Sequence, residues 1–182
     1  MAATVAAIVL TGGCTTEAKD SKNATTTPSP SASPSASPTP SADPLATDKA
    51  DVQTAYDRYW GVLTAAYAKA DSSGTDLKIV ASGSAYAQTE SGLANLRKAG
   101  QVITGKTQHS GTAVDFKDGQ KLKTAVITDC VDVSQWKPVD KKTGQEVVLP
   151  SQRLLRYITT LTAEKWPSGW VVIEEKFQDQ TC

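Results

Sequence analysis

The segment from Lys121 to Val133 reads KLKTAVITDCVDV and predicts a strand at the centre of a sheet. Threonine and β-branched side chains dominate it, and these residues favour an extended, packed backbone. Between Leu122 and Cys130 both alternating sets of side chains are partly apolar. A half-exposed strand would carry one apolar set and one polar set, so this strand is expected to be central.

Three further segments after Gly100 share this character. Residues 102–116, 153–162 and 170–177 are rich in Val, Ile, Thr and aromatic side chains, and turn residues bound each of them. The sequence therefore predicts four antiparallel strands in the C-terminal part of the chain.

The segment before Gly100 has a helical pattern instead. A shorter helix is expected at 76–82 and another at 84–98, with Gly100 as the stop signal. Helices first and antiparallel strands afterwards define the α+β class. Between residues 46 and 71, apolar side chains recur at steps of three and four, as on one buried face of a helix: Val52, Ala55, Tyr56, Tyr59, Val62 or Leu63, Ala66 and Tyr67.

This order of elements resembles the NTF2-like superfamily, in which N-terminal helices pack on a curved four-stranded antiparallel sheet to form a cone. The resemblance covers residues 46–182. The aromatic residues Tyr56, Tyr59 and Trp60 and the closing hairpin WPSGW at 166–170 add to it. The arrangement looks like the NTF2-like domains of actinobacterial lipoproteins. A cystatin-like or another helix-on-sheet fold is the alternative.

The first segment, residues 1–13, reads MAATVAAIVLTGG and is expected to be a signal peptide. Its apolar run is too short to span a bilayer as a helix, which needs about 20 residues. The sequence LTGGC resembles the lipobox of bacterial lipoproteins, with Thr11 in the position that usually holds an aliphatic residue. The resemblance implies that Cys14 receives the lipid and anchors the chain to the outer face of the cell membrane.

Residues 14–45 are expected to form a disordered, lipid-anchored stalk. This segment is rich in Ser, Thr and Pro, and from Thr15 to Asp43 no apolar residue is larger than alanine. Such a composition buries too little apolar surface to offset the entropy of ordering. The predicted organisation is therefore a signal peptide at 1–13, a stalk at 14–45 and one α+β domain at 46–182.

With Cys14 assigned to the lipid, Cys130 and Cys182 remain as an even pair outside the cytoplasm. Extracytoplasmic cysteines in pairs are usually oxidised, so a disulfide between them is expected. This bridge would hold the end of the chain, after Phe177, across the sheet.

The NTF2-like resemblance implies a pocket between the first helix and the concave face of the sheet. Its expected walls are Tyr56, Tyr59 and Trp60, with Asp129 and Tyr157 as the polar groups within reach.

Neighbouring polar residues give no clear catalytic group. Asp129 and Asp132 are three residues apart on one strand, so they are expected on opposite faces unless a bulge intervenes. His109 lies in a polar stretch and is expected at the surface. Catalytic residues therefore stay unassigned.

Composition excludes several classes of function. Lys plus Arg and Asp plus Glu are 19 each, so no basic face for nucleic acid is expected. There is one histidine and no Cys/His cluster, and neither a metal nor a cofactor is expected. The sequence favours a lipid-anchored extracytoplasmic domain that binds or scaffolds a partner protein or a small ligand without catalysis. The alternative is a small isomerase-, dehydratase- or hydrolase-like enzyme that uses a pocket aspartate.

Overall fold

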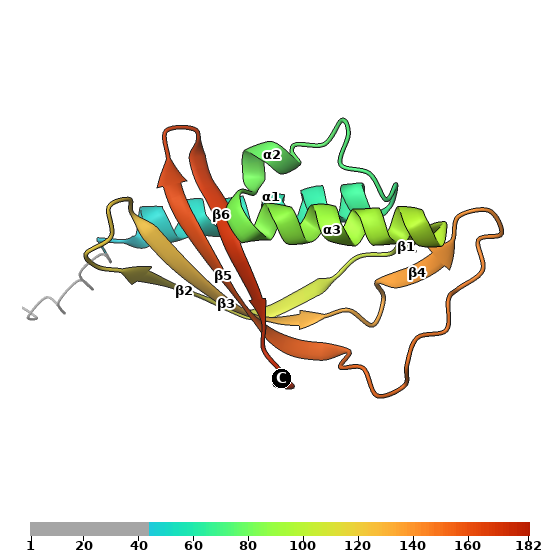
Figure 1. Cartoon of the computed structure of the whole chain (residues 1–182). Helices are drawn as coiled ribbons and strands as arrows, with labels where there is room; N and C mark the ends of the chain where they lie inside the picture. The colour runs from blue at the N-terminus through green and yellow to red at the C-terminus, as the bar shows by residue number, and fades with distance from the viewer. Residues whose placement is uncertain (1–43) are drawn as a thin grey trace, which may run out of the picture. The chain divides into compact units, whose positions relative to one another are not determined.

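The computed structural model describes residues 44–182, in which three helices precede six strands (Figure 1). The leader, Cys14 and the stalk up to residue 43 lie outside the described residues. The helices are α1 (Ala46–Tyr67), α2 (Leu77–Val80) and α3 (Gly83–Ala99). The strands are β1 (Gln101–Thr104), β2 (Gln108–Lys117), β3 (Thr124–Asp132), β4 (Lys137–Asp140), β5 (Arg156–Trp166) and β6 (Gly169–Phe177).

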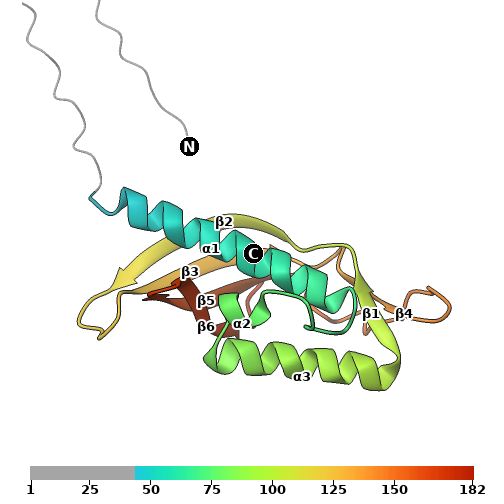
Figure 2. The same ribbon diagram turned by 90° about the horizontal axis from the view of Figure 1, so that it is seen from above.

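The strands form two antiparallel sheets, which confirms the predicted α+β class. The larger sheet has four strands in the order β2-β3-β5-β6, and β1 pairs with β4 in the smaller one. Figure 2 shows α1 and α3 on the same side of the sheet. β3 is an inner strand, as its two-sided apolar pattern predicted.

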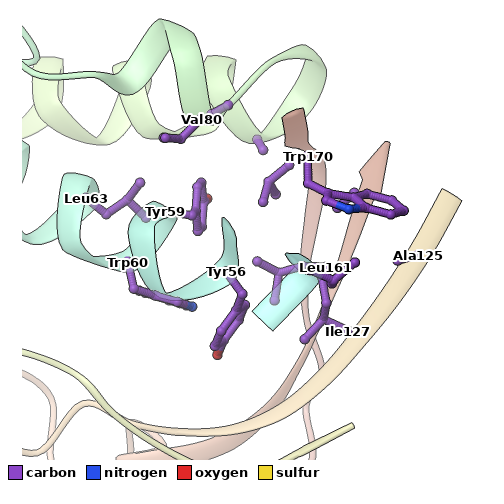
Figure 3. Close-up of a cluster of buried hydrophobic side chains, with 14 of the residues drawn as sticks. Tyr56, Tyr59, Trp60, Leu63, Val80, Ala125, Ile127, Leu161 and Trp170 are labelled. Carbon is purple, nitrogen blue, oxygen red and sulfur yellow. The ribbon is translucent and has the colours of Figure 1, made fainter. Parts of the chain in front are cut away.

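Helix α1 buries the face that its periodicity predicted. Val52, Tyr56, Tyr59, Trp60 and Leu63 are all buried at steps of one, three and four residues. In Figure 3, Tyr56, Tyr59, Trp60 and Leu63 project from this helix into the cluster that includes residues of the sheet. Aromatic side chains on α1 therefore build much of the core between helix and sheet.

Helix α3 ends where the sequence placed its stop signal. Gly100 adopts a left-handed conformation, with φ of 67°, and its N–H bonds back to the carbonyls of Arg97 and Leu96. Glycine is favoured there because it has no Cβ to oppose a positive φ.

Two strand predictions need correction. The expected strand at 102–116 is divided into β1 and β2 around Gly105, whose Cα lies so close to the carbonyl of Gln135 that an added Cβ would collide with it. Strand β4 was not predicted, because it has four residues and includes Pro138. It pairs with β1 over its whole length.

The predicted disulfide between Cys130 and Cys182 is present. After β6, the backbone of Gln178 and Gln180 continues to bond with Ile158 of β5. Ile158 is itself the partner of Cys130 in β3, so the last residues cross from β5 to β3 and the disulfide holds them there. The sequence separation of 52 residues makes this bridge a long-range constraint on the unfolded chain.

Candidate functional site

Two carboxylates are buried in the described part of the chain, and both lie on the side of the sheet that faces the helices. Asp129 on β3 is 1% exposed and Glu175 on β6 is 7% exposed. Burying a carboxylate is costly unless hydrogen bonds or opposite charges compensate it. The two sites differ in how far they meet this requirement.

Asp129 is fully engaged by three donors, which come from α1 and β2. The Tyr56 hydroxyl donates to its Oδ2 at 2.7 Å, His109 Nδ1 lies 2.8 Å from the same oxygen, and the Thr112 hydroxyl donates to Oδ1 at 2.8 Å. Burial alone would raise the pKa of Asp129, but these hydrogen bonds outweigh it and hold the pKa below its usual value. Asp129 is therefore an ionised, hydrogen-bonded carboxylate.

His109 belongs to this network, which corrects the expectation that it lies free at the surface. Its side chain is 22% exposed, and its ring lies 4.7 Å from that of Trp60. The carboxylate of Asp129 accepts from Nδ1, and in the neutral ring Nε2 accepts from the Thr107 hydroxyl, 2.7 Å away. This assignment of the tautomer follows from the hydrogen-bond partners.

A β-bulge in β2 brings His109 and Thr112 to the same carboxylate. These residues are three apart, so strict alternation would place them on opposite faces. The pairing of β2 with β3 shifts between Ser110 and Ala113, and Gly111 within the shift has a φ of 67°. The extra residue turns Thr112 toward Asp129, as bulges near sites often re-aim side chains.

Asp132 lies away from this network, as the spacing on β3 predicted. It is half-buried, its Oδ1 caps the backbone N–H of Ser134, and Arg156 lies 4.0 Å away. Asp129 and Asp132 therefore do not form a dyad.

Glu175 is only partly satisfied. Its Oε2 accepts a hydrogen bond from the Tyr59 hydroxyl at 2.8 Å, whereas its Oε1 is buried and has no partner among the described residues. Burial raises the pKa of Glu175, although the Tyr59 hydrogen bond and the nearby His109 oppose the shift. Few buried polar atoms in proteins lack a partner, and each exception needs an explanation.

A second bulge directs Glu175 inward. The pairing of β5 with β6 shifts between Thr162 and Ala163, which leaves Ile173 as the additional residue on β6. Before the bulge Trp170 and Val172 face the core, and after it the inward side passes to Glu175. Simple alternation from Trp170 would have selected Glu174 instead, so sequence reasoning missed Glu175.

Glu175 lines a cavity of about 110 Å³ whose walls are mainly aromatic. The indole N–H groups of Trp60 and Trp136 are buried and unpartnered in the described residues. Burial and the charge of Glu175 raise the pKa of Tyr67 and of Tyr157 to about 12, so both phenols stay neutral at physiological pH. The walls consist of Trp60, Leu63, Tyr67, Gln88, Thr89, Trp136, Tyr157, Glu175 and Phe177.

The five residues that the sequence placed in a pocket therefore have different roles. Trp60 and Tyr157 line the cavity. Tyr56 and Tyr59 are buried in the core, and their hydroxyls bond Asp129 and Glu175 respectively. Asp129 lies inside the fold, but it is enclosed in its own network.

Larger hollows lie elsewhere on the described part of the chain, but the one with the best-defined wall holds no buried carboxylate. One of about 370 Å³ lies between β4 and residues 146–155. Its acidic residue, Glu146, is exposed and already pairs with Lys137 at 3.0 Å. The cavity at Glu175 is smaller, but it combines burial, aromatic walls and an unpartnered charge-bearing atom.

The fold and the site together define an α+β domain with a small, aromatic, acidic cavity between helices and sheet. No group of three or more His, Cys, Asp or Glu side chains in residues 44–182 is placed to hold a metal ion. None of the described helices has the length and apolarity needed to cross a membrane.

Comparisons with known proteins identify no family for this chain. No family model matches it, and no curated protein matches it. Among solved structures it is similar to the intermembrane-space region of the chloroplast protein ARC6, at 14% identity and a TM-score of 0.46. That match covers 72% of this chain and 95% of the other.

Proposed function

We propose that this protein is an extracytoplasmic lipoprotein, anchored through Cys14, whose NTF2-like domain at 46–182 binds a small ligand without catalysis. The cavity beside Glu175 is the observation that carries this proposal. A buried carboxylate with one unpartnered oxygen costs stability, and a molecule bound in the adjoining cavity would compensate that cost through its own charge or dipole.

Replacement by glutamine illustrates why Glu175 points to a ligand. A glutamine at 175 would still accept the hydrogen bond from Tyr59 and would carry no buried charge. The carboxylate makes a stronger, charge-assisted hydrogen bond than an amide does, but it also adds the desolvation of a charge, which outweighs that hydrogen bond and raises the pKa of Glu175. Groups that oppose stability in this way are typical of functional sites.

Two further features support the location and the fold family. The disulfide between Cys130 and Cys182 is typical of oxidising, extracytoplasmic compartments. A cavity between α1 and α3 on one side and an antiparallel sheet on the other supports the resemblance to NTF2-like domains.

One observation favours the alternative of a pocket enzyme. Thr107, His109 and Asp129 are linked in the order hydroxyl, imidazole, carboxylate, which is the order found in hydrolase triads. Thr107 is 7% exposed, however, and both oxygens of Asp129 already accept hydrogen bonds. In such a triad the hydroxyl must reach the substrate, and Thr107 is buried and is not part of the wall of the Glu175 cavity, so the network supports a structural role better.

Native mass spectrometry of the protein recovered from the envelope of its own host tests the proposal. A retained small-molecule adduct is expected, together with a mass deficit of two hydrogens for the disulfide. A bare mass, or a complex with another protein alone, would contradict ligand binding and favour a tethered scaffold.

Membrane attachment is tested separately. The Cys14→Ala variant is expected to leave the membrane fraction and appear in the medium, because it has no thiol for the lipid. Retention in the membrane fraction at the wild-type level would contradict lipid anchoring. Blotting of the two fractions provides the measurement.

A further inference from the structure

The wall of the Glu175 cavity contains a carboxylate but no positively charged side chain, and it is rich in aromatic residues. Glu175 is its one ionisable group apart from two tyrosines, and no Lys or Arg contributes to the walls. Five of its residues are aromatic and come from α1, the β3–β4 connection, β5 and β6: Trp60, Tyr67, Trp136, Tyr157 and Phe177. Such a cavity attracts positive charge from two sources, a carboxylate and the negative faces of aromatic rings.

The aromatic walls hold one another in place. Trp136 packs edge-on against Tyr67 at 5.0 Å and against Trp60 at 6.4 Å. On the opposite side, Tyr157 packs edge-on against Phe177 at 5.6 Å. The enclosure is therefore formed by supported rings, and a ligand does not have to order them on binding.

The size of the cavity limits what it can hold. About 110 Å³ is enough for several water molecules or for one compact group, but not for a sugar ring with its hydroxyls. Besides Glu175, the groups of the wall that can form hydrogen bonds are Gln88, Thr89, the hydroxyls of Tyr67 and Tyr157, and the indole N–H groups of Trp60 and Trp136. An outer hollow of about 400 Å³ shares Tyr157 and Phe177 with the cavity. A substituent on the bound group could extend into it.

From these observations we propose that the cavity binds the alkylated ammonium group of a small organic cation, with Glu175 as its counter-ion. The proposal rests on the proposed ligand-binding function and specifies the class of ligand. A cation in the cavity needs no direct bond to Oε1, because Glu175 is buried and charges a few ångströms apart interact more strongly there than in bulk water. Its binding would favour the ionised form of Glu175 and release a proton to solvent.

Choline and its neutral isostere, 3,3-dimethyl-1-butanol, provide a direct test. The two have nearly the same shape and differ in one positive charge. Isothermal titration calorimetry on the purified full-length chain should show choline binding at least ~10-fold more tightly, since a desolvated cation–aromatic contact alone contributes about that much. Equal affinity for the two would overturn the proposal while leaving a cavity that binds ligands.

Two neighbouring variants separate the counter-ion from general effects on the strand. Glu175→Gln should weaken choline binding by ~10-fold or more and leave the isostere unaffected. Glu174→Gln is the matched control, because Glu174 is half-exposed and pairs with Lys176, so choline affinity should not change. Equal loss in both variants, or no loss in Glu175→Gln, would overturn the role of Glu175.

The pH dependence gives an independent readout. Choline affinity should rise with pH through the titration of Glu175 in the wild type and stay flat in Glu175→Gln. A pH slope that persists in the variant would overturn the assignment. If choline fails to bind but the native mass spectrum shows another adduct, the cation proposal fails and the ligand-binding function stands. If choline fails and no adduct appears, both fail.

Discussion

Asp129 and Glu175 are two buried carboxylates in one core, and they differ in the number of hydrogen bonds that they accept. Asp129 accepts hydrogen bonds from Tyr56, His109 and Thr112, which keep its pKa low. Glu175 accepts one hydrogen bond from Tyr59, and burial raises its pKa. Asp129 links α1 to β2 and β3 through its hydrogen bonds. Glu175 borders a cavity, and its Oε1 has no hydrogen-bond partner among the described residues.

A buried acid with a structural role and one with a functional role can be distinguished by how their replacement changes stability. A satisfied network rigidifies the core and is strongly destabilised when one member is removed. A buried charged group with too few hydrogen bonds lowers the stability of the fold, and removal of its charge raises that stability. Opposite effects on stability are therefore expected from substitutions at the two sites.

The largest effect is expected from Asp129→Ala. The change leaves the Tyr56 and Thr112 hydroxyls and His109 without their shared acceptor in the core, and we expect the free energy of unfolding to fall by about 3 to 5 kcal/mol. Urea denaturation measures the difference. Asp132→Ala is the control on the same strand, since Asp132 is on the opposite face and should cost less than about 1 kcal/mol. Similar losses in both variants would mean that the Asp129 network contributes no more to stability than the contacts of Asp132 do.

A smaller effect of opposite sign is expected from Glu175→Gln. The folded-state pKa of Glu175 is raised, so above about pH 4.5 the folded protein binds more protons than the unfolded chain, and wild-type stability falls as pH rises toward that raised pKa. Glutamine does not titrate, so the variant does not lose stability in this way as pH rises. It should be more stable than the wild type by about 1 kcal/mol near neutral pH. Thermal melts of both proteins from pH 4 to pH 8 measure the gap, which should widen with pH. A gap that stays constant or reverses would contradict the assignment.

An effect similar in size to that of Glu175→Gln, but destabilising, is expected at the β2 bulge that completes the Asp129 network. Gly111 has a positive φ and open space around it, so Gly111→Ala adds backbone strain of about 1 kcal/mol without a collision. Gly61→Ala is the matched control, because Gly61 is within α1 and alanine should stabilise a helix there. Denaturation midpoints that move the same way in both variants would contradict the role of the bulge.

Much of the fold could be predicted from the sequence, because periodicity reports on local structure. The buried face of α1, the glycine stop at Gly100 and the inner position of β3 followed from spacing and residue type. Strand β4 could not be predicted, because a short segment that contains Pro138 has no pattern of its own. Its strand conformation depends on pairing with β1.

The candidate site was less accessible to sequence reasoning. Tyr56, Tyr59 and Trp60 were expected inside because large aromatic side chains recur on one helix face, and they are buried. His109 and Glu175 were misjudged or missed, since the face that each residue occupies depends on bulges in β2 and β6.

Residue spacing and residue type were enough to predict the α+β order, the helix boundaries to within a few residues and the cysteine pair that forms the bridge. The full set of hydrogen bonds to Asp129 and the incomplete set to Glu175 depend on how the folded chain packs. The physical reason is that alternation along a strand holds only while residues pair one to one. An extra residue at Thr112 or Ile173 reverses the faces beyond it, and its position depends on how neighbouring strands and helices pack.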